Sequence, residues 1–203
     1  MRLSGSPSEP AYRELALGNF LELVSAAEPA PAGGSAAAIT VALAAGLCVM
    51  AARLSTRQLP DATDLARVAE RLRDRAVALC QADADAYRLF MSALQEPREP
   101  DPEDRRSRIV AALSVATDVP LEVVETGAHV ADLAARIAEC GNPNLLGDAV
   151  TAALLAESGV RAASTLVLIN LKGLRDDERR SRMAKLVEET TESAGRAWRR
   201  IES

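Results

Sequence analysis

Apolar residues recur along the chain at spacings of three and four, and no stretch shows the strict alternation of apolar and polar positions that is typical of a strand. The sequence therefore predicts an all-helical protein. Proline-rich and charged segments separate the helices, and Pro120 either kinks one helix or starts the next. The predicted helices cover residues 12–27, 35–55, 65–94, 102–117, 120–140, 148–173 and 176–201.

The helix predicted over residues 35–55 is apolar on nearly every side, because one threonine is the only polar residue between Ala36 and Ala52. A helix of this kind usually lies at the centre of a bundle. We therefore expect an up-and-down bundle of six to seven helices around a buried, alanine-rich helix. Residues 11–203 are expected to form this single domain, after a disordered segment over residues 1–10.

The length of this apolar segment approaches that of a membrane-spanning helix. Its alanine content and its regularly spaced small residues favour close packing inside a globular bundle instead, so no membrane contact is expected. The first ten residues are polar and predict no secretory signal. These features indicate a cytoplasmic protein.

The net charge limits the kinds of ligand that are expected, and the cysteines and the histidine show whether a metal site is expected. A net charge of −5 argues against nucleic acid, but not against an anionic small molecule, for which one local basic patch suffices. Cys48, Cys80 and Cys140 are far apart and odd in number, so we interpret them as reduced, small apolar side chains. His129 is the single histidine and no cysteine pair has the spacing of metal ligands, so no metal site is expected.

Asp83 is the residue whose position most strongly indicates a functional role. Helical geometry places it on the apolar stripe of the helix over residues 65–94, whereas Asp74 and Asp85 fall on the solvent face. A buried carboxylate is costly unless it is paired or hydrogen-bonded, so it serves either a structural contact or a function. The apolar stripe consists of Leu72, Ala76, Leu79, Tyr87, Phe90 and Leu94.

Gly33, Gly34 and Ser35 lie where the alanine-rich helix begins. Two glycines allow a ligand to approach the backbone closely, and the free N–H groups of a helix N-terminus favour anions. The same residues equally fit a flexible turn in which Ser35 caps the helix. Both interpretations remain open at this point.

A second turn, over residues 141–147, carries Asn142 and Asn144 just before Asp148. Asp148 either caps the helix that follows, which is the usual role of such an aspartate, or serves a site. Further along the same helix, Asn170 lies opposite the charged face and is predicted to be buried. A buried amide requires hydrogen-bond partners.

In their order along the chain, these segments resemble the cyclodeaminase domain of formiminotransferase cyclodeaminase and its bacterial relative, methenyltetrahydrofolate cyclohydrolase. The resemblance covers residues 20–177. It is carried by the segments PAPAGGS (29–35), ARLS (52–55), DADAY (83–87), VPL (119–121), GNPN with the aspartate that follows (141–148) and INL (169–171).

The resemblance implies a folate one-carbon enzyme. Such an enzyme acts either as a cyclodeaminase, converting 5-formiminotetrahydrofolate into 5,10-methenyltetrahydrofolate and ammonia, or as a methenyltetrahydrofolate cyclohydrolase. The tetrahydrofolate derivative is the substrate, and no other cofactor is implied because no electron moves. A homodimer is implied as well, with the alanine-rich helix near the subunit contact.

The resemblance also implies the site residues. Asp83 is expected to be the general acid or base, and Asp148 the second catalytic group. One of two arginines is expected to meet the glutamate tail of the folate. The expected substrate-binding residues are Gly33, Gly34, Ser35, Arg53, Arg57, Asn142, Asn144 and Asn170.

Three positions depart from the family pattern. Ala32 replaces a glycine, Gly147 replaces a serine, and Leu166 stands where many relatives carry an asparagine. These departures leave an alternative in which the chain is a catalytically inactive helical homodimeric subunit, or a folate-binding protein, on the same scaffold.

Overall fold

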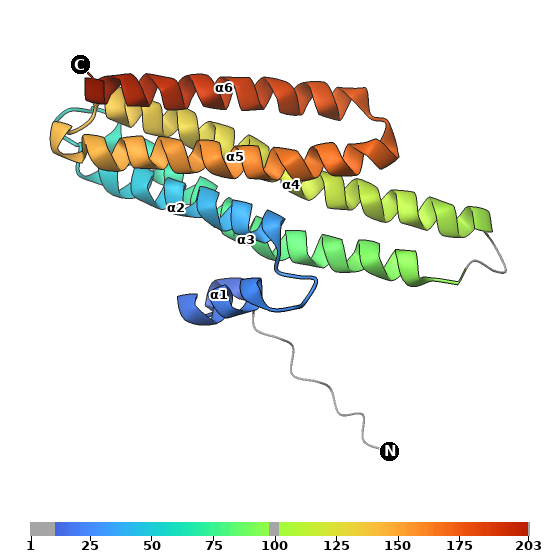
Figure 1. Ribbon diagram of the computed structural model, residues 1–203. Coiled ribbons are helices and arrows are strands. Elements are labelled where there is room, and N and C mark those ends of the chain that lie inside the picture. The colour runs from blue at the N-terminus through green and yellow to red at the C-terminus, as the bar shows by residue number, and fades with distance from the viewer. Residues whose placement is uncertain (1–10, 98–101, 203) are drawn as a thin grey trace.

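The structure of the protein, a computed structural model, describes residues 11–97 and 102–202. In these ranges it contains six α-helices, two short 3-10 helices and no strand, which confirms the all-helical prediction (Figure 1). The predicted disorder of residues 1–10 lies outside the described residues. The elements are η1 (Tyr12–Glu14), α1 (Leu17–Ser25), α2 (Gly33–Arg53), α3 (Ala62–Gln95), α4 (Pro102–Cys140), η2 (Pro143–Leu145), α5 (Leu146–Leu174) and α6 (Asp177–Glu202).

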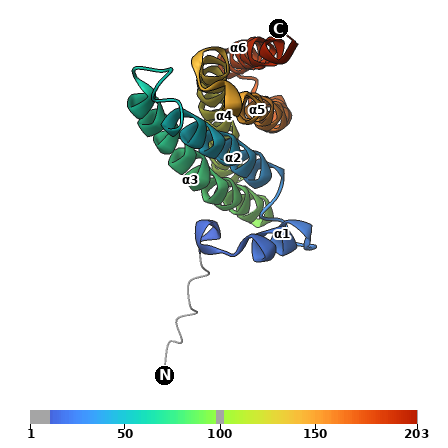
Figure 2. The same cartoon turned by 90° about the vertical axis from the view of Figure 1, so that its left-hand side faces the viewer.

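The helices from α2 to α6 form an up-and-down bundle in three layers (Figure 1, Figure 2). The first layer holds α2 and α3, the second holds α4 and α5, and α6 covers the second layer from the far side. Consecutive helices run in opposite directions, as predicted. The short helix α1 stands apart from the bundle, near the N-terminal end of α2 (Figure 2).

Small residues let α2 and α5 approach each other closely. A Cβ atom built on Gly159 of α5 would lie 2.7 Å from Val41 Cγ2 and 3.1 Å from the backbone oxygen of Ala37. Because the aromatic content is only 2%, the core is filled mainly by alanine, valine and leucine. Such small side chains fill an interior densely only where the backbones approach each other closely.

α2 is buried around most of its circumference but not around all of it. Ala38, Ala44 and Ala45 are fully buried, whereas Leu43 is 60% exposed and Met50 is 36% exposed. The expected buried, alanine-rich helix is therefore present, but one of its stripes is not covered by the rest of the described chain. An apolar face indicates that some surface should cover it, but not whether that surface belongs to the same chain.

Pro120 does not start a new helix, because α4 runs as one helix from Pro102 to Cys140. Proline lacks the N–H that would bond to the carbonyl group four residues earlier, so the carbonyl of Ala116 loses its partner within the helix. The side chain of Asn170 replaces that partner, since its Nδ2 donates to the Ala116 oxygen at 2.8 Å.

The N-terminal segment differs from its prediction as well. A single helix was expected over residues 12–27, but Leu15 and Ala16 adopt extended backbone angles and separate η1 from α1. Extended residues cannot belong to a helix, so two short elements replace one long element.

The three cysteines are free, as expected. Cys48 and Cys80 are buried among apolar side chains, but Cys140 is exposed, so its interpretation as core filler is wrong. It lies at the last residue of α4, where the helix meets the second turn and leaves the core.

Two segments, Gly33–Arg53 and Pro143–Leu174, are long and apolar enough to cross a membrane. Inside the protein, however, 61% of the apolar window of the first and 44% of that of the second are buried. Core helices of globular bundles have the same length and composition, and α2 and α5 pack against each other and against α4.

The close contact between α2 and α5 predicts that a glycine-to-alanine substitution changes the stability of the protein differently at two positions. Gly159→Ala should destabilise the protein by about 1–3 kcal/mol, because the new methyl group overlaps Val41 and the backbone of Ala37. Gly195→Ala in α6 is the control, because its Cβ would meet only the tip of the Arg199 side chain at 3.4 Å. Since alanine favours the helix more than glycine does, the stability of this variant should be unchanged or raised by up to about 1 kcal/mol. Urea unfolding of both variants measures the difference, and equal stabilities would contradict the packing described.

Candidate active site

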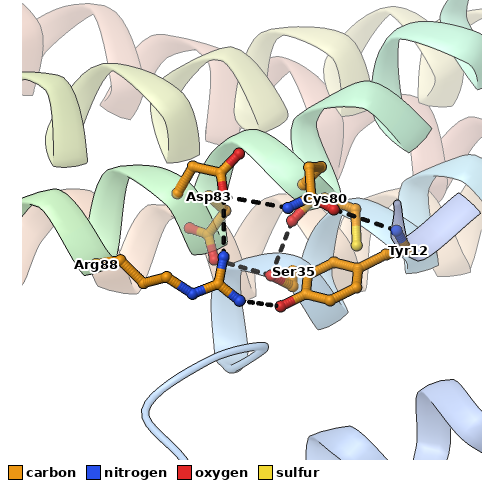
Figure 3. A network of polar contacts seen from close by, with 7 residues as sticks. Tyr12, Ser35, Cys80, Asp83 and Arg88 are labelled. Atoms are coloured by element: carbon orange, nitrogen blue, oxygen red, sulfur yellow. Dashed lines mark hydrogen bonds and ion pairs between the residues drawn. The ribbon is translucent and has the colours of Figure 1, made fainter. Parts of the chain in front are cut away.

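Asp83 lies in α3, and its carboxyl group rests against the first turn of α2 (Figure 3). A Cβ atom built on Gly34 would lie 2.0 Å from Asp83 Oδ1 and 2.4 Å from Cγ. A side chain at this position would therefore displace the carboxyl group. At Gly33, by contrast, a Cβ would meet no atom within 4 Å. The second glycine of the turn is the one that this arrangement requires.

Ser35 connects α2 to α3 beside this contact (Figure 3). Its buried hydroxyl donates to the backbone oxygen of Cys80 at 2.9 Å and lies 3.2 Å from Asp83 Oδ2. Because a hydroxyl has one hydrogen, it can donate to only one of these acceptors at a time. The N-cap of α2 is Ala32, so the alternative in which Ser35 caps the helix is wrong.

Burial raises the pKa of Asp83 above its ordinary value, and hydrogen bonds from the hydroxyl and the main-chain N–H of Ser35 oppose this effect only in part. Burial likewise raises the pKa of the Cys80 thiol to about 12, so the thiol stays protonated. Within residues 11–97 and 102–202, no ion pair joins Asp83 to an arginine or a lysine. The protonated form of Asp83 therefore persists to higher pH than that of an exposed aspartate, which suits proton transfer.

Asp83 forms part of the wall of a cavity of about 260 Å³ between α2, α3, α4 and α5. The turn before α2 closes one side of it, and two aromatic side chains of α3 continue the wall beyond Asp83. Mostly apolar cavities with a few polar groups are the usual form of small-molecule sites. The lining includes Gly33, Gly34, Tyr87, Phe90, Leu166 and Asn170.

Asn170 is fixed in the wall of this cavity by the proline in α4. Its Nδ2 donates to the Ala116 oxygen that Pro120 leaves free, and all three residues line the cavity. The prediction that Asn170 needs a partner in the interior is thereby confirmed, although the side chain is half-buried rather than fully buried. With one N–H engaged, Asn170 retains a carbonyl oxygen that can accept a hydrogen bond from a ligand.

The turn that carries Asn142 and Asn144 docks on the far end of α2. The Asn142 backbone N–H donates to Ser55 Oγ at 2.9 Å, and its Nδ2 donates to the Leu54 oxygen at 3.1 Å. Its Oδ1 accepts from the Asn144 backbone N–H at 3.1 Å. Asn142 therefore holds the turn together, whereas the Asn144 side chain is exposed.

Asp148 lies in the first turn of α5, three residues after the N-cap, Leu145. The alternative in which Asp148 caps the helix is therefore wrong. A carboxylate in the first turn is still favoured by the helix dipole. At the same end of the bundle, Arg53 forms an ion pair with Glu70, and Arg57 is exposed just beyond α2.

The predicted site residues thus fall into two groups at opposite ends of α2. The length of α2, 21 residues, separates the groups by about 30 Å at 1.5 Å per residue. The cavity end holds Gly33, Gly34, Ser35, Asp83 and Asn170, and the turn end holds Arg53, Arg57, Asn142, Asn144 and Asp148.

Sequence reasoning missed a cluster that flanks the cavity end. The Tyr12 hydroxyl accepts from Arg88 Nη2 at 2.8 Å, and the Tyr12 backbone N–H donates to Gln81 Oε1 at 3.1 Å (Figure 3). Arg88 and Tyr12 line a second hollow that shares Pro29 and Ala30 with the cavity. Periodicity could not reveal this cluster, because Tyr12 and Arg88 are 76 residues apart and meet only in the folded chain.

Fold and site together describe an all-helical bundle whose cavity is built from a glycine turn, an inward aspartate and an asparagine. Residues 16–189 match the family model described as Formiminotransferase-cyclodeaminase. The chain belongs to this family, and is therefore a family enzyme of the folate cyclodeaminase or methenyltetrahydrofolate cyclohydrolase type, as the resemblance implied.

Individual relatives support the assignment. The chain is 37% identical to the methenyltetrahydrofolate cyclohydrolase of Methylorubrum extorquens over 165 residues, which cover 77% of this chain and 79% of the relative. It is 32% identical to the formimidoyltransferase-cyclodeaminase of Rattus norvegicus over 93% of this chain, but spans only 37% of the rat protein. A crystal structure of formiminotetrahydrofolate cyclodeaminase from Thermotoga maritima superposes with a TM-score of 0.79 and 26% identity, covering 94% of this chain and 95% of the other.

The two glycines of the turn should respond differently to the same substitution. Gly34→Ala places a methyl group on the Asp83 carboxyl, breaks its contact with Ser35 and should destabilise the protein by about 1–3 kcal/mol. Gly33→Ala enters open space and should leave the stability unchanged or raise it by up to about 1 kcal/mol. Urea unfolding compares the two variants, and a Gly34→Ala protein as stable as Gly33→Ala would show that the carboxyl group lies elsewhere.

Proposed function

We propose that this protein acts on a one-carbon unit carried by tetrahydrofolate, with Asp83 as the group that transfers protons. The substrate is either 5-formiminotetrahydrofolate, which cyclises with loss of ammonia, or 5,10-methenyltetrahydrofolate, whose bridge is opened by water. The observation that carries the proposal is a half-buried carboxyl group with a raised pKa in the wall of the cavity.

Both reactions pass through a tetrahedral carbon that is bonded to N5 and N10, and in cyclodeamination this carbon also carries the exocyclic nitrogen. In cyclodeamination, N10 attacks the formimino carbon, loses its proton, and the exocyclic nitrogen leaves as ammonia once it is protonated. In cyclohydrolysis, water adds to the methenyl carbon and loses a proton, and a ring nitrogen takes up a proton as its bond to that carbon breaks. Each reaction needs one group that accepts a proton and returns it, which a carboxyl group of raised pKa can do.

The remaining residues of the cavity end would orient the substrate. Asn170 keeps a carbonyl oxygen available for an N–H group of the pterin, and Gly33 leaves the helix N-terminus accessible. The flat faces of Tyr87 and Phe90 suit an aromatic ligand. Asp148, the proposed second catalytic group, lies at the turn end, about 30 Å from the cavity end of the same chain. Asn144, proposed to contact the pterin, and Arg53 and Arg57, proposed to bind the glutamate tail, lie at that end too, and Asn142 holds their turn in place.

No redox cofactor takes part in this proposal, because neither reaction transfers an electron, and the proposed steps use no metal ion. We further propose a cytoplasmic homodimer without contact to nucleic acid or membrane, in line with the net charge of −5.

One observation favours a second candidate, a catalytically inactive subunit or a folate-binding protein on the same scaffold. Two of the three departures from the family pattern, Ala32 and Leu166, line the cavity itself. Leu166 puts an apolar side chain one turn before Asn170, where many relatives carry an asparagine. The loss of one polar group from the wall changes what the cavity can hydrogen-bond.

The proposal is tested by following the methenyl chromophore spectrophotometrically with each substrate. Asp83→Asn should lower kcat at least about a hundredfold, since it removes the proton-transferring group. Asp74→Asn, on the solvent face of the same helix, is the control and should keep wild-type kcat. A folded Asp83→Asn protein with full activity would remove Asp83 from the mechanism. Wild-type protein that binds tetrahydrofolate but turns over neither substrate would support the inactive candidate.

A further inference from the structure

A closed ring of hydrogen bonds holds Arg88 beside the cavity (Figure 3). Arg88 Nη1 donates to Asp85 Oδ1 at 2.9 Å, and its Nη2 donates to the Tyr12 hydroxyl at 2.8 Å. Gln81 completes the ring, because its Nε2 donates to Asp85 Oδ1 at 3.1 Å and its Oε1 accepts from the Tyr12 backbone N–H. These contacts fix the guanidinium group and leave its remaining N–H groups available to an anion.

The phenol of Tyr12 adds a second donor next to Arg88. Burial raises the pKa of Tyr12 above its ordinary value, and the positive charge of Arg88 opposes this effect only in part, so the phenol keeps its proton at neutral pH. The phenol oxygen accepts from Arg88, so its own hydrogen can be donated to another acceptor. The ring of Phe20 packs edge-on against the Tyr12 ring, with centroids 6.0 Å apart, and holds it in place. A guanidinium group beside a phenolic O–H suits carboxylate oxygens.

Arg88 and Tyr12 line a hollow of about 580 Å³ that adjoins the cavity of Asp83. Pro29 and Ala30 line both spaces, so they form the boundary between them. Among the described residues that line the two spaces, Arg88 is the only basic one, so a negatively charged part of a ligand in the cavity meets its nearest positive charge here. The rest of the wall of the hollow is mostly apolar and includes Leu15, Leu23 and Pro31.

The cavity alone is too small for a whole folate. Its volume of about 260 Å³ is below the range of about 300–1,000 Å³ that is usual for the sites of drug-sized ligands. A tetrahydrofolate carries an aminobenzoyl group and a glutamate beyond its pterin, so these parts must extend past the cavity. Arg53 and Arg57 lie about 30 Å away, at the turn end of the same chain. Arg88 follows Asp83 in α3 by only about 7.5 Å of helix rise.

We propose that Arg88, together with the Tyr12 hydroxyl, binds the glutamate carboxylates of the folate substrate in the hollow beside the cavity. The inference rests on the proposed function, because the pterin must lie against Asp83 for the tail to reach Arg88. Carboxylate oxygens accept from the N–H groups of Arg88 that the ring of hydrogen bonds does not use. Glu28 also lines the hollow, and its negative charge repels the tail. Arg88 and Glu28 therefore change the affinity for the tail in opposite directions.

Calorimetry with two ligands that differ only in the tail tests this assignment. Tetrahydrofolate ends in glutamate, whereas the amide of tetrahydropteroic acid ends in an uncharged carboxamide, so the ratio of their Kd values measures what the tail contributes. Arg88→Gln should weaken the binding of tetrahydrofolate about tenfold and leave that of the amide unchanged, because it removes a charge-assisted contact with the tail. Glu28→Gln should tighten the binding of tetrahydrofolate alone, because it removes a repulsion.

Arg67→Gln is the matched control, because Arg67 also pairs with an aspartate three residues earlier in α3, Asp64, but lines neither space. It should leave both Kd values unchanged. If Arg88→Gln weakens both ligands equally, Arg88 only supports the structure of the hollow, and the assignment is wrong. If Arg57→Gln removes the difference between the ligands and Arg88→Gln does not, the tail binds at the turn end, which also overturns the assignment.

Binding and turnover together distinguish the failure of this inference from the failure of the proposed function. A wild-type protein that prefers tetrahydrofolate to the amide through Arg88, yet turns over neither one-carbon substrate, would support the tail site while the proposed function fails. A protein that turns over a substrate with a KM that Arg88→Gln does not change would overturn the tail site alone. A protein that binds neither ligand would contradict both proposals.

Discussion

The carboxyl group of Asp83 rests against the backbone of Gly34, and the other features of the cavity depend on that contact. It brings the start of α2 against the middle of α3 and takes the carboxyl group partly out of water. Ser35 reinforces the contact with a hydrogen bond to α3. Burial raises the pKa of Asp83 more than these hydrogen bonds lower it. The raised pKa suits the carboxyl group to the proton transfer proposed for it.

The opposite wall depends on a second local constraint. Pro120 removes one hydrogen bond from α4 and leaves the oxygen of Ala116 without its helical donor. Asn170 supplies the missing donor from α5 and is thereby fixed at the cavity. Two short motifs that are 50 residues apart in the sequence, Val-Pro-Leu and Ile-Asn-Leu, therefore form one structural unit.

Helical periodicity predicted the architecture well because the core is built from helix-forming small residues with clear apolar stripes. The same periodicity placed Asp83 inside and Asp74 outside, as the structure does. Periodicity failed where contacts between residues far apart in the sequence determine the structure. It could not show that Asn170 stabilises α4 at Pro120, or that Tyr12 contacts Arg88. The capping roles considered for Ser35 and Asp148 were wrong because both helices begin two or three residues earlier. The length of α2 sets the distance between Ser35 and Arg53, and the sequence predicted that helix. Only tertiary structure shows that Asp83 lies at one end of α2 and Asn142 at the other.

The central claim is that burial against α2 gives Asp83 an unusual affinity for its proton. A ¹³C NMR titration of the Asp83 carboxyl carbon, assigned by comparison with Asp83→Asn, measures this affinity directly. The account predicts a midpoint above that of an unperturbed aspartate, about 3.9. A midpoint at or below that value would show that the carboxyl group is solvated or paired, and would contradict both the described contact and its proposed role in proton transfer.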